Sequence, residues 1–119
     1  MGNQIVHWEL LVTDLQSAKI FYSKVFDWEF DESSYPGYTL VDTGAQPGGG
    51  MMAKPDEVPG CALNTYFLVD DVDATMAKAT EAGATVAVPK TAIPGIGHWA
   101  MFTDPDGIPI ALLQPEGQM

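Results

Sequence analysis

The sequence contains no arginine, a single cysteine and only two histidines among 119 residues. Its five basic residues are all lysine, against 16 Asp and Glu, so the formal net charge is −11. Nucleic-acid binding needs Lys and Arg set against phosphates, so this composition argues against it. Without Arg, a phosphate or carboxylate ligand would have to be held by Lys, backbone N–H groups or a helix N-terminus. A neutral or cationic ligand is easier to accommodate.

Other absences narrow the class further. The lone Cys61 excludes an intrachain disulfide, and its apolar surroundings predict a core position. No apolar run approaches the ~20 residues of a membrane span. The N-terminal segment MGNQIVHWELL has no basic stretch followed by a long apolar one, so we expect a cytoplasmic protein without a secretory signal. The hydrophobic fraction of 46% is typical of a globular chain and excludes wholesale disorder.

The sequence contains an internal repeat with an offset of 57 residues. The segment HWELLVTD that begins at His7 resembles the segment NTYFLVDD that begins at Asn64. Each has a strand-like apolar run, an acidic helix start and a helical pattern of about twelve residues. A repeat of this kind predicts two copies of one supersecondary unit.

The helical patterns predict one helix over 15–26 and another over 72–82. Thr13 or Asp14 would cap the first helix, and Asp70 or Asp71 the second. We expect Asp27 to adopt the left-handed conformation after the first helix and Gly83 to end the second. The first apolar stripe is the thicker one and consists of Leu15, Ala18, Phe21, Tyr22, Val25 and Phe26.

Three strand-like segments follow each predicted helix, separated by Pro-Gly and Asp-Pro-Asp-Gly turns. They cover residues 28–31, 38–43, 49–53, 85–88, 98–103 and 108–114. The sequence therefore predicts an α+β fold with two βαβββ modules, at about 4–53 and 61–115, joined by a linker over 54–60. Because one module of this size would be marginal alone, we expect a single domain over 1–119.

This order of motifs resembles the vicinal oxygen chelate superfamily, which includes glyoxalase I, extradiol dioxygenases and bleomycin-resistance proteins. The resemblance is carried by the segment from His7 to Leu15, the pair Phe21-Tyr22, the segment Val69-Asp70-Asp71 and the turn from Asp104 to Gly107. It covers nearly the whole chain and is strongest to short, single-domain glyoxalase-related proteins. It implies a cup of curved sheets formed by the two paired modules, with the helices outside and a ligand cavity inside.

Metal-dependent members of that superfamily carry ligands on four strands, and the resemblance maps these ligands onto this chain. The positions are His7, Asn64, Ala111 and the stretch from Gly50 to Met52. Only His7 is a common ligand, since Asn binds Zn²⁺, Ni²⁺, Mn²⁺ or Fe²⁺ poorly. We therefore expect no metal cofactor, although the scaffold resembles that of the metalloenzymes.

Strand alternation places Glu9 and Leu11 in the cup if His7 faces it, as the resemblance implies. His7 and Glu9 are the candidate catalytic residues, either as an acid/base pair or as a structural ion pair, and His7 is alternatively a remnant of an ancestral ligand. Either Met51 or Met52, and either His98 or Trp99, would face inward. The candidate ligand-binding residues are Leu11, Met51, Met52, Asn64, Tyr66, His98, Trp99 and Ala111.

These features favour a small-molecule-binding protein of the glyoxalase or bleomycin-resistance type, with no metal and no assigned reaction. One alternative is a metal-independent lyase or isomerase that uses Glu9 or His7 as acid or base. A weaker alternative is a metal-dependent glyoxalase I-like lyase or dioxygenase. Whether the protein is an enzyme stays open at this point. The expected partners are a small organic molecule and, in a homodimer, a second copy, with no nucleic acid and no membrane.

Overall fold

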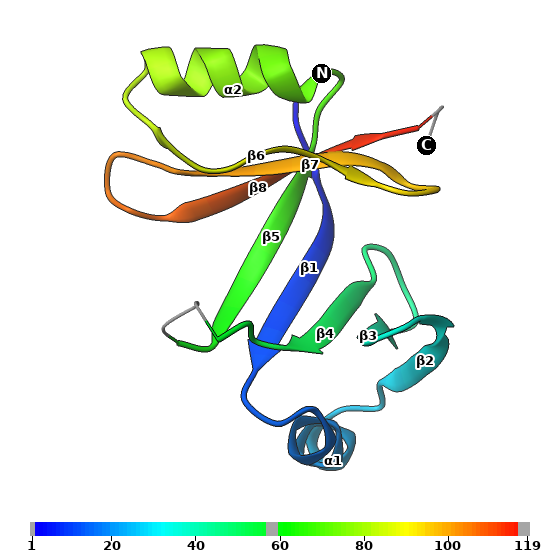
Figure 1. The fold of residues 1–119 in the computed structure, drawn as a ribbon. Coiled ribbons are helices and arrows are strands. Elements are labelled where there is room, and N and C mark those ends of the chain that lie inside the picture. The colour runs from blue at the N-terminus through cyan, green and yellow to red at the C-terminus, as the bar shows by residue number, and fades with distance from the viewer. Residues whose placement is uncertain (1, 57–59, 117–119) are drawn as a thin grey trace. The chain divides into compact units, whose positions relative to one another are not determined.

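A computed structural model describes residues 2–56 and 60–116 and confirms a mixed α+β fold with two βαβββ modules (Figure 1). By its contacts the chain divides into two compact units, residues 6–64 and residues 1–5 with 65–119. The division falls inside two strands, so the units and the repeated modules differ slightly. Part of the predicted linker, 57–59, lies outside the described residues. No helix in the described part of the chain is long and apolar enough to cross a membrane.

The first module contains one helix and four strands. They are β1 (Ile5–Val12), α1 (Leu15–Val25), β2 (Glu29–Tyr35), β3 (Tyr38–Asp42) and β4 (Gly49–Ala53). The strands lie in the order β2-β3-β4-β1, with β4 antiparallel to β3 and parallel to β1. The central strand β4 therefore separates β1 from β3, which matters for the candidate site.

The second module repeats this plan. It contains β5 (Ala62–Leu68), α2 (Val72–Glu81), β6 (Thr85–Ile93), β7 (Gly97–Thr103) and β8 (Pro109–Pro115). The strand order is β5-β8-β7-β6, with β8 parallel to β5 and antiparallel to β7. Helix α2 packs against the sheet formed by β6, β7 and β8 (Figure 1).

Aspartate caps start both helices at the second of the two predicted positions. Asp14 Oδ1 accepts a hydrogen bond from the Ser17 amide at 2.9 Å, and Asp71 Oδ1 accepts one from the Ala74 amide at 3.1 Å. Each bond satisfies an amide that has no partner within the first helical turn. The caps thus distinguish Asp14 and Asp71 from their neighbours.

The ends of the helices differ more from expectation. Gly83 has φ +112° and ends α2 as predicted. The left-handed position predicted for Asp27 is wrong, because no described residue other than glycine has a positive φ. Helix α1 instead ends at Val25, and Phe26 is extended with φ −126° and ψ 158°. The chain leaves α1 directly into β2 without a left-handed residue.

Strand β6 runs to Ile93, five residues beyond its predicted end, although it contains Pro89. It is an edge strand of its sheet, where a missing N–H costs no ladder bond on the open side. Its pairing with β7 shifts register between Val88 and Thr91. The irregularity accommodates the proline inside one continuous strand.

The two helices are buried to different extents. Helix α2 contributes Val72 and Met76 to a core cluster with Val69, Ala100 and Leu112. Helix α1 has no fully buried residue, and three of its six predicted core positions are exposed, namely Phe21, Val25 and Phe26.

Aromatic rings pack beside α1 instead. The ring centroid of Trp28 lies 4.8 Å from that of Phe26, 5.2 Å from that of Tyr22 and 5.3 Å from that of Trp8. Cys61, predicted as core, is exposed, with its Sγ 3.2 Å from the Thr13 hydroxyl.

Candidate functional site

One face of the first module's sheet brings together the polar side chains of β1 and β3. The register places Glu9 beside Gly50 and Gly50 beside Leu40, so these three positions share a face. Strand alternation adds His7 on β1 and Tyr38 on β3. Tyr38 belongs to this face although the sequence analysis did not select it.

The hydroxyl of Tyr38 connects His7 with Glu9. It lies 2.8 Å from His7 Nε2 and donates a hydrogen bond to Glu9 Oε2 at 2.9 Å. The side chains of His7 and Tyr38 also stack, with ring centroids 6.2 Å apart. Glu9 is only 8% exposed, and a carboxylate so buried needs donors to offset its lost hydration. The three side chains form one hydrogen-bonded chain.

Gly50 makes this reach across β4 possible. A Cβ added at Gly50 would overlap the hydroxyl and ring of Tyr38. The ring therefore lies against the bare backbone of β4, between β3 and β1. The adjacent Gly49 has the same relation to the indole of Trp8 on the opposite face. Two of the three glycines of the run, Gly49 and Gly50, are thus explained by aromatic contacts.

Burial lowers the pKa of His7 from its ordinary value of 6.5, because desolvation penalises the imidazolium. At neutral pH the ring is therefore uncharged. A neutral imidazole carries one N–H donor and one acceptor nitrogen, so it can accept a proton or a hydrogen bond.

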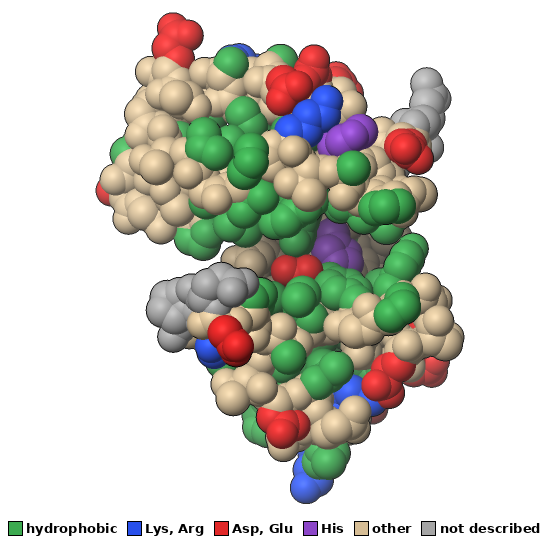
Figure 2. Space-filling view, in the orientation of Figure 1, with side chains coloured by type: hydrophobic (Ala, Val, Ile, Leu, Met, Phe, Trp, Pro, Cys, Tyr) green, Lys and Arg blue, Asp and Glu red, His purple; other side chains and the backbone are tan. Residues whose placement is uncertain are grey.

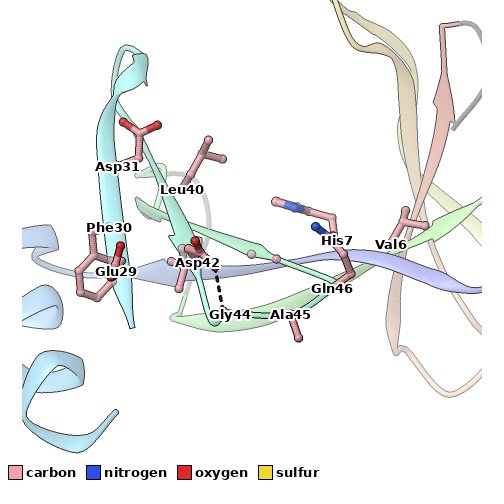
Figure 3. A pocket seen from close by; sticks show the side chains of 13 residues that line it. Val6, His7, Glu29, Phe30, Asp31, Leu40, Asp42, Gly44, Ala45 and Gln46 are labelled. Atoms are coloured by element: carbon pink, nitrogen blue, oxygen red, sulfur yellow. Dashed lines mark hydrogen bonds between the residues drawn. The ribbon is translucent and has the colours of Figure 1, made fainter. Parts of the chain in front are cut away.

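A groove of about 700 Å³ lies in the unit of residues 6–64, with Val6 and His7 of β1 at one end (Figure 3). Figure 3 shows Asp31 of β2 at the other end, with Leu40 and Asp42 of β3 between them. The remaining lining residues are Val6, Glu29, Phe30, Val41, Gly44, Ala45, Gln46, Gly48 and Gly49. The mixture of apolar and polar groups and the volume are typical of a small-molecule site.

The groove is lined by three acidic side chains, Glu29, Asp31 and Asp42. None of the lining residues in the described part of the chain is Lys. Hydrogen bonds from the side chain of Ser34 and from the side chain and amide of Ser33 lower the pKa of Asp31 to about 2. Asp42 accepts a hydrogen bond from the Gly44 amide at 2.8 Å (Figure 3). Elsewhere acidic side chains occur at several separate places on the face shown in Figure 2. The groove favours a neutral or cationic ligand over an anion.

The structure separates the predicted site residues of the first module. Leu11 and Met52 are register partners and lie on the face of His7 and Glu9. Met51 pairs with Leu10 on the opposite face and is completely buried, so of the two methionines left open by the sequence it is Met52 that shares the face of His7. Asn64 is buried near the end of the same unit.

The predicted residues of the second module divide in the same way. Tyr66 pairs with Ala111, and the register of β7 with β8 places Trp99 on their face. The rings of Tyr66 and Trp99 are 6.1 Å apart. His98 lies on the opposite face with Ala100, which packs against α2. Of the pair left open by the sequence, Trp99 shares the face of Tyr66.

The donor set does not fit the metal that the family resemblance implies. On β4, the positions that share a face with His7 are Gly50 and Met52, which supply no carboxylate or imidazole. Glu9 is the nearest acid along β1, and its carboxylate accepts the bond from Tyr38. Within 2–56 and 60–116, no three His, Cys, Asp or Glu side chains gather to hold a metal ion. Transition metals in this family need a stronger set of donors.

Sequence reasoning missed Tyr38 and most of the groove. Two signals were available: the alternation of Tyr38, Leu40 and Asp42 along one strand, and the run from Gly48 to Gly50. Neither signal identifies the partner without the register, because Tyr38 reaches Glu9 across an intervening strand. The acidic lining of β2 likewise depends on how β2 pairs with β3.

Comparison with known proteins identifies a family. Residues 4–112 match the Glyoxalase/Bleomycin resistance protein/Dioxygenase superfamily. The chain is 32% identical over 113 residues to CFP32 of Mycobacterium tuberculosis, which is named a candidate glyoxylase. That match covers 89% of this chain and 43% of CFP32, so the chain spans less than half the length of this relative.

Solved structures show the same fold at lower identity. A variant of homoprotocatechuate 2,3-dioxygenase from B. fuscum superimposes with a TM-score of 0.70 at 22% identity, covering 98% of this chain and 33% of the other. The Mn(II)-bound glyoxalase of Novosphingobium aromaticivorans gives a TM-score of 0.67 at 22% identity, covering 93% and 38%. At this identity the likeness concerns the fold alone.

Proposed function

Because the chain belongs to the glyoxalase/bleomycin resistance protein/dioxygenase superfamily, we propose that it binds a small organic molecule in the groove beside His7, without the metal site of the family's metalloenzymes. The observation that carries this proposal is the groove itself, with His7 at one end and an apolar and acidic lining. The ligand is a neutral or cationic compound with an aromatic or aliphatic body. Phe30 and Leu40 supply apolar contacts for that body.

A thermal-shift screen tests the binding proposal. Neutral and cationic aromatic compounds should raise the melting temperature, whereas matched carboxylates should not, because a ligand that binds only the native state stabilises it by mass action. At a hundredfold excess over the dissociation constant the stabilisation is about 2.7 kcal/mol. A panel in which only anions bind, or nothing binds at millimolar concentration, would contradict the proposal.

A groove-filling variant locates the binding. Leu40→Trp should weaken a hit at least tenfold in calorimetric titration, because the larger side chain occupies the groove. Phe21→Leu is the matched control, since Phe21 is exposed on α1 and does not line the groove. Equal affinity in wild type and Leu40→Trp would place the ligand elsewhere.

A second candidate function is a metal-independent lyase or isomerase, favoured by the hydrogen-bonded chain of His7, Tyr38 and Glu9. A neutral His7 could serve as a general base and Glu9 would stabilise the developing positive charge through Tyr38. NMR spectra of a bound compound over hours separate the two functions. Product formation that Glu9→Gln abolishes, with ligand affinity kept, indicates the enzyme, and an unchanged compound indicates a binding protein.

Two further expectations accompany the proposal. Metal analysis of protein purified without chelator should find no stoichiometric transition metal, and one tightly held ion per chain would favour the metal-dependent alternative. The expected homodimer is checked by sedimentation. The contributions predicted for Asn64, Tyr66, Trp99 and Ala111 are checked by the effect of their substitution on ligand affinity.

A further inference from the structure

We propose that Glu9, acting through the hydroxyl of Tyr38, fixes neutral His7 as the tautomer protonated on Nε2, and that Gly50 is the positioning residue that permits this contact. The tautomer exists without any ligand, whereas its consequence for recognition rests on the proposed function. Tyr38 and Gly50 are thus assigned roles beside His7 and Glu9, the two candidate catalytic residues of the sequence analysis.

The direction of the hydrogen bonds follows from the chemistry of the three groups. The Tyr38 O–H donates to Glu9 Oε2, 2.9 Å away, which fits an ionised carboxylate, because that group only accepts. The single proton of Tyr38 is then used, and its oxygen can only accept from His7 Nε2 at 2.8 Å. His7 must therefore hold a proton on Nε2. A neutral ring then carries its lone pair on Nδ1.

The separation of β1 from β3 explains why Tyr38 is needed. Strand β4 lies between them, so a side chain on β3 must cross a whole strand to reach Glu9. Tyrosine is long enough only if nothing stands on β4 at the crossing point. Gly50 lies beside both Glu9 and Leu40 in the register, and a Cβ there would overlap the Tyr38 ring and hydroxyl.

The tautomer decides whether His7 donates or accepts in a hydrogen bond to a ligand. A neutral ring protonated on Nε2 has Nδ1 as its acceptor nitrogen, so a group that hydrogen-bonds to the ring at Nδ1 must be a donor. Compounds with a hydroxyl, amide N–H or ammonium group match this requirement. The acidic lining from Glu29, Asp31 and Asp42 favours the same kind of ligand.

Long-range ¹H–¹⁵N correlation spectra of the ligand-free protein, taken at neutral pH, read the tautomer directly. The chain has two histidines, and His98 on the other module serves as an internal reference in every spectrum. Wild-type His7 should show a protonated Nε2 and an unprotonated Nδ1. In Tyr38→Phe the preference should weaken to a mixture, because the acceptor oxygen is gone.

Two further variants separate positioning from general damage. Glu9→Gln keeps the shape of the side chain, but its amide can donate as well as accept, so it should also give a mixture of tautomers. Gly50→Ala should have the same effect as Tyr38→Phe, by displacing the ring. Gly49→Ala is the matched control: it perturbs Trp8 on the opposite face and should leave the His7 tautomer unchanged.

Two outcomes would overturn the proposal. One is an Nδ1-protonated His7 in the wild type, which would require a chain running from a protonated Glu9 towards the ring. Another is a tautomer unaffected by Tyr38→Phe, Glu9→Gln and Gly50→Ala in folded protein. Because Glu9→Gln is isosteric, it tests the proposal even if Tyr38→Phe fails to fold. A ligand screen without hits would contradict the proposed function, but it would not change these spectra, which are recorded without ligand.

Discussion

The two modules share one strand order and register, here called the strand frame, but carry different side chains at equivalent positions. In the first module Glu9 of β1 lies beside Gly50 of β4, and in the second Tyr66 of β5 lies beside Ala111 of β8. The third strands correspond as well, because Leu40 pairs with Gly50 as Met101 pairs with Ala111. The repeat detected in the sequence is therefore also a repeat of register.

Two residues before these third-strand positions stand Tyr38 and Trp99. Tyr38 makes a hydrogen bond to Glu9 in the first module, and Trp99 makes a ring contact with Tyr66 at 6.1 Å in the second. One copy of the frame thus carries a polar chain and the other an aromatic pair. The comparison teaches that the frame fixes which positions meet, while the side chains there decide the chemistry.

In the sequence the first helix has the thicker apolar stripe, but in the structure it is α2 that contributes buried side chains to a core cluster. A pair of substitutions tests this difference and has the largest expected effect. Leu112→Ala removes a buried side chain from the cluster under α2 and should cost about 2–5 kcal/mol of unfolding free energy. Val25→Ala on α1 removes an exposed side chain and should cost less than about 0.5 kcal/mol. Denaturant titration measures both. Similar losses at the two positions would show that α1 is as well packed as α2.

The polar chain of the first module predicts the next largest effect. Tyr38→Phe removes a donor from the nearly buried carboxylate of Glu9 and should cost about 1–3 kcal/mol. Tyr35→Phe is the control, because Tyr35 is exposed at the end of β2 and its loss should be within about 0.5 kcal/mol. In a Glu9→Gln background the cost of Tyr38→Phe should fall. Additive costs would mean that the two side chains are not coupled.

The helix caps test the comparison through a smaller loss, about 1 kcal/mol of unfolding free energy for each cap. Asp71→Ala and Asp14→Ala each remove one cap bond, with an expected loss of about 0.5–2 kcal/mol. Because α2 contributes to a buried cluster, Asp71→Ala should lower global stability. Because α1 has no fully buried residue, Asp14→Ala should mainly speed amide exchange within α1. Hydrogen exchange that is unchanged in α1 would contradict this difference.

The smallest expected effect is a pH dependence specific to the first module. The pKa of His7 is lowered by burial in the folded state, so the native protein resists protonation of this ring. The associated stability is complete above the unfolded pKa of 6.5 and is lost as the pH falls through the lower folded pKa. NMR titration of the His7 ring should give a midpoint below 6.5. His7→Asn should flatten this part of the stability profile, and a midpoint above 6.5 would contradict the prediction.

Much of the fold could be predicted from the sequence because local signals were strong. Strand β4 has its predicted bounds, and both helices begin at their predicted residues. The end of α1 was wrong because Asp tolerates a left-handed conformation without requiring it, and the chain continued extended at Phe26. Pro89 ended the predicted β6 early, since edge position is a property of the sheet and not of the local sequence.

The site was less predictable than the fold. His7 and Glu9 were found because alternation along one strand is local. The faces of Met51 and His98 could not be predicted locally, because only the register of neighbouring strands places Met51 away from His7 and His98 away from Tyr66. Tyr38 required two facts at once, the strand order and the bare backbone at Gly50, and neither is encoded near Tyr38 itself.

The consecutive glycines of β4 give this strand an unusual value for protein engineering. Successive residues of a strand address opposite faces, so Gly49 and Gly50 are adjoining but independent points of intervention. A library at Gly49 would remodel the packing of Trp8 behind the sheet, and a library at Gly50 would remodel the polar chain in front of it. The packing of Trp8 and the polar chain of Tyr38 could therefore be varied separately, through two neighbouring codons.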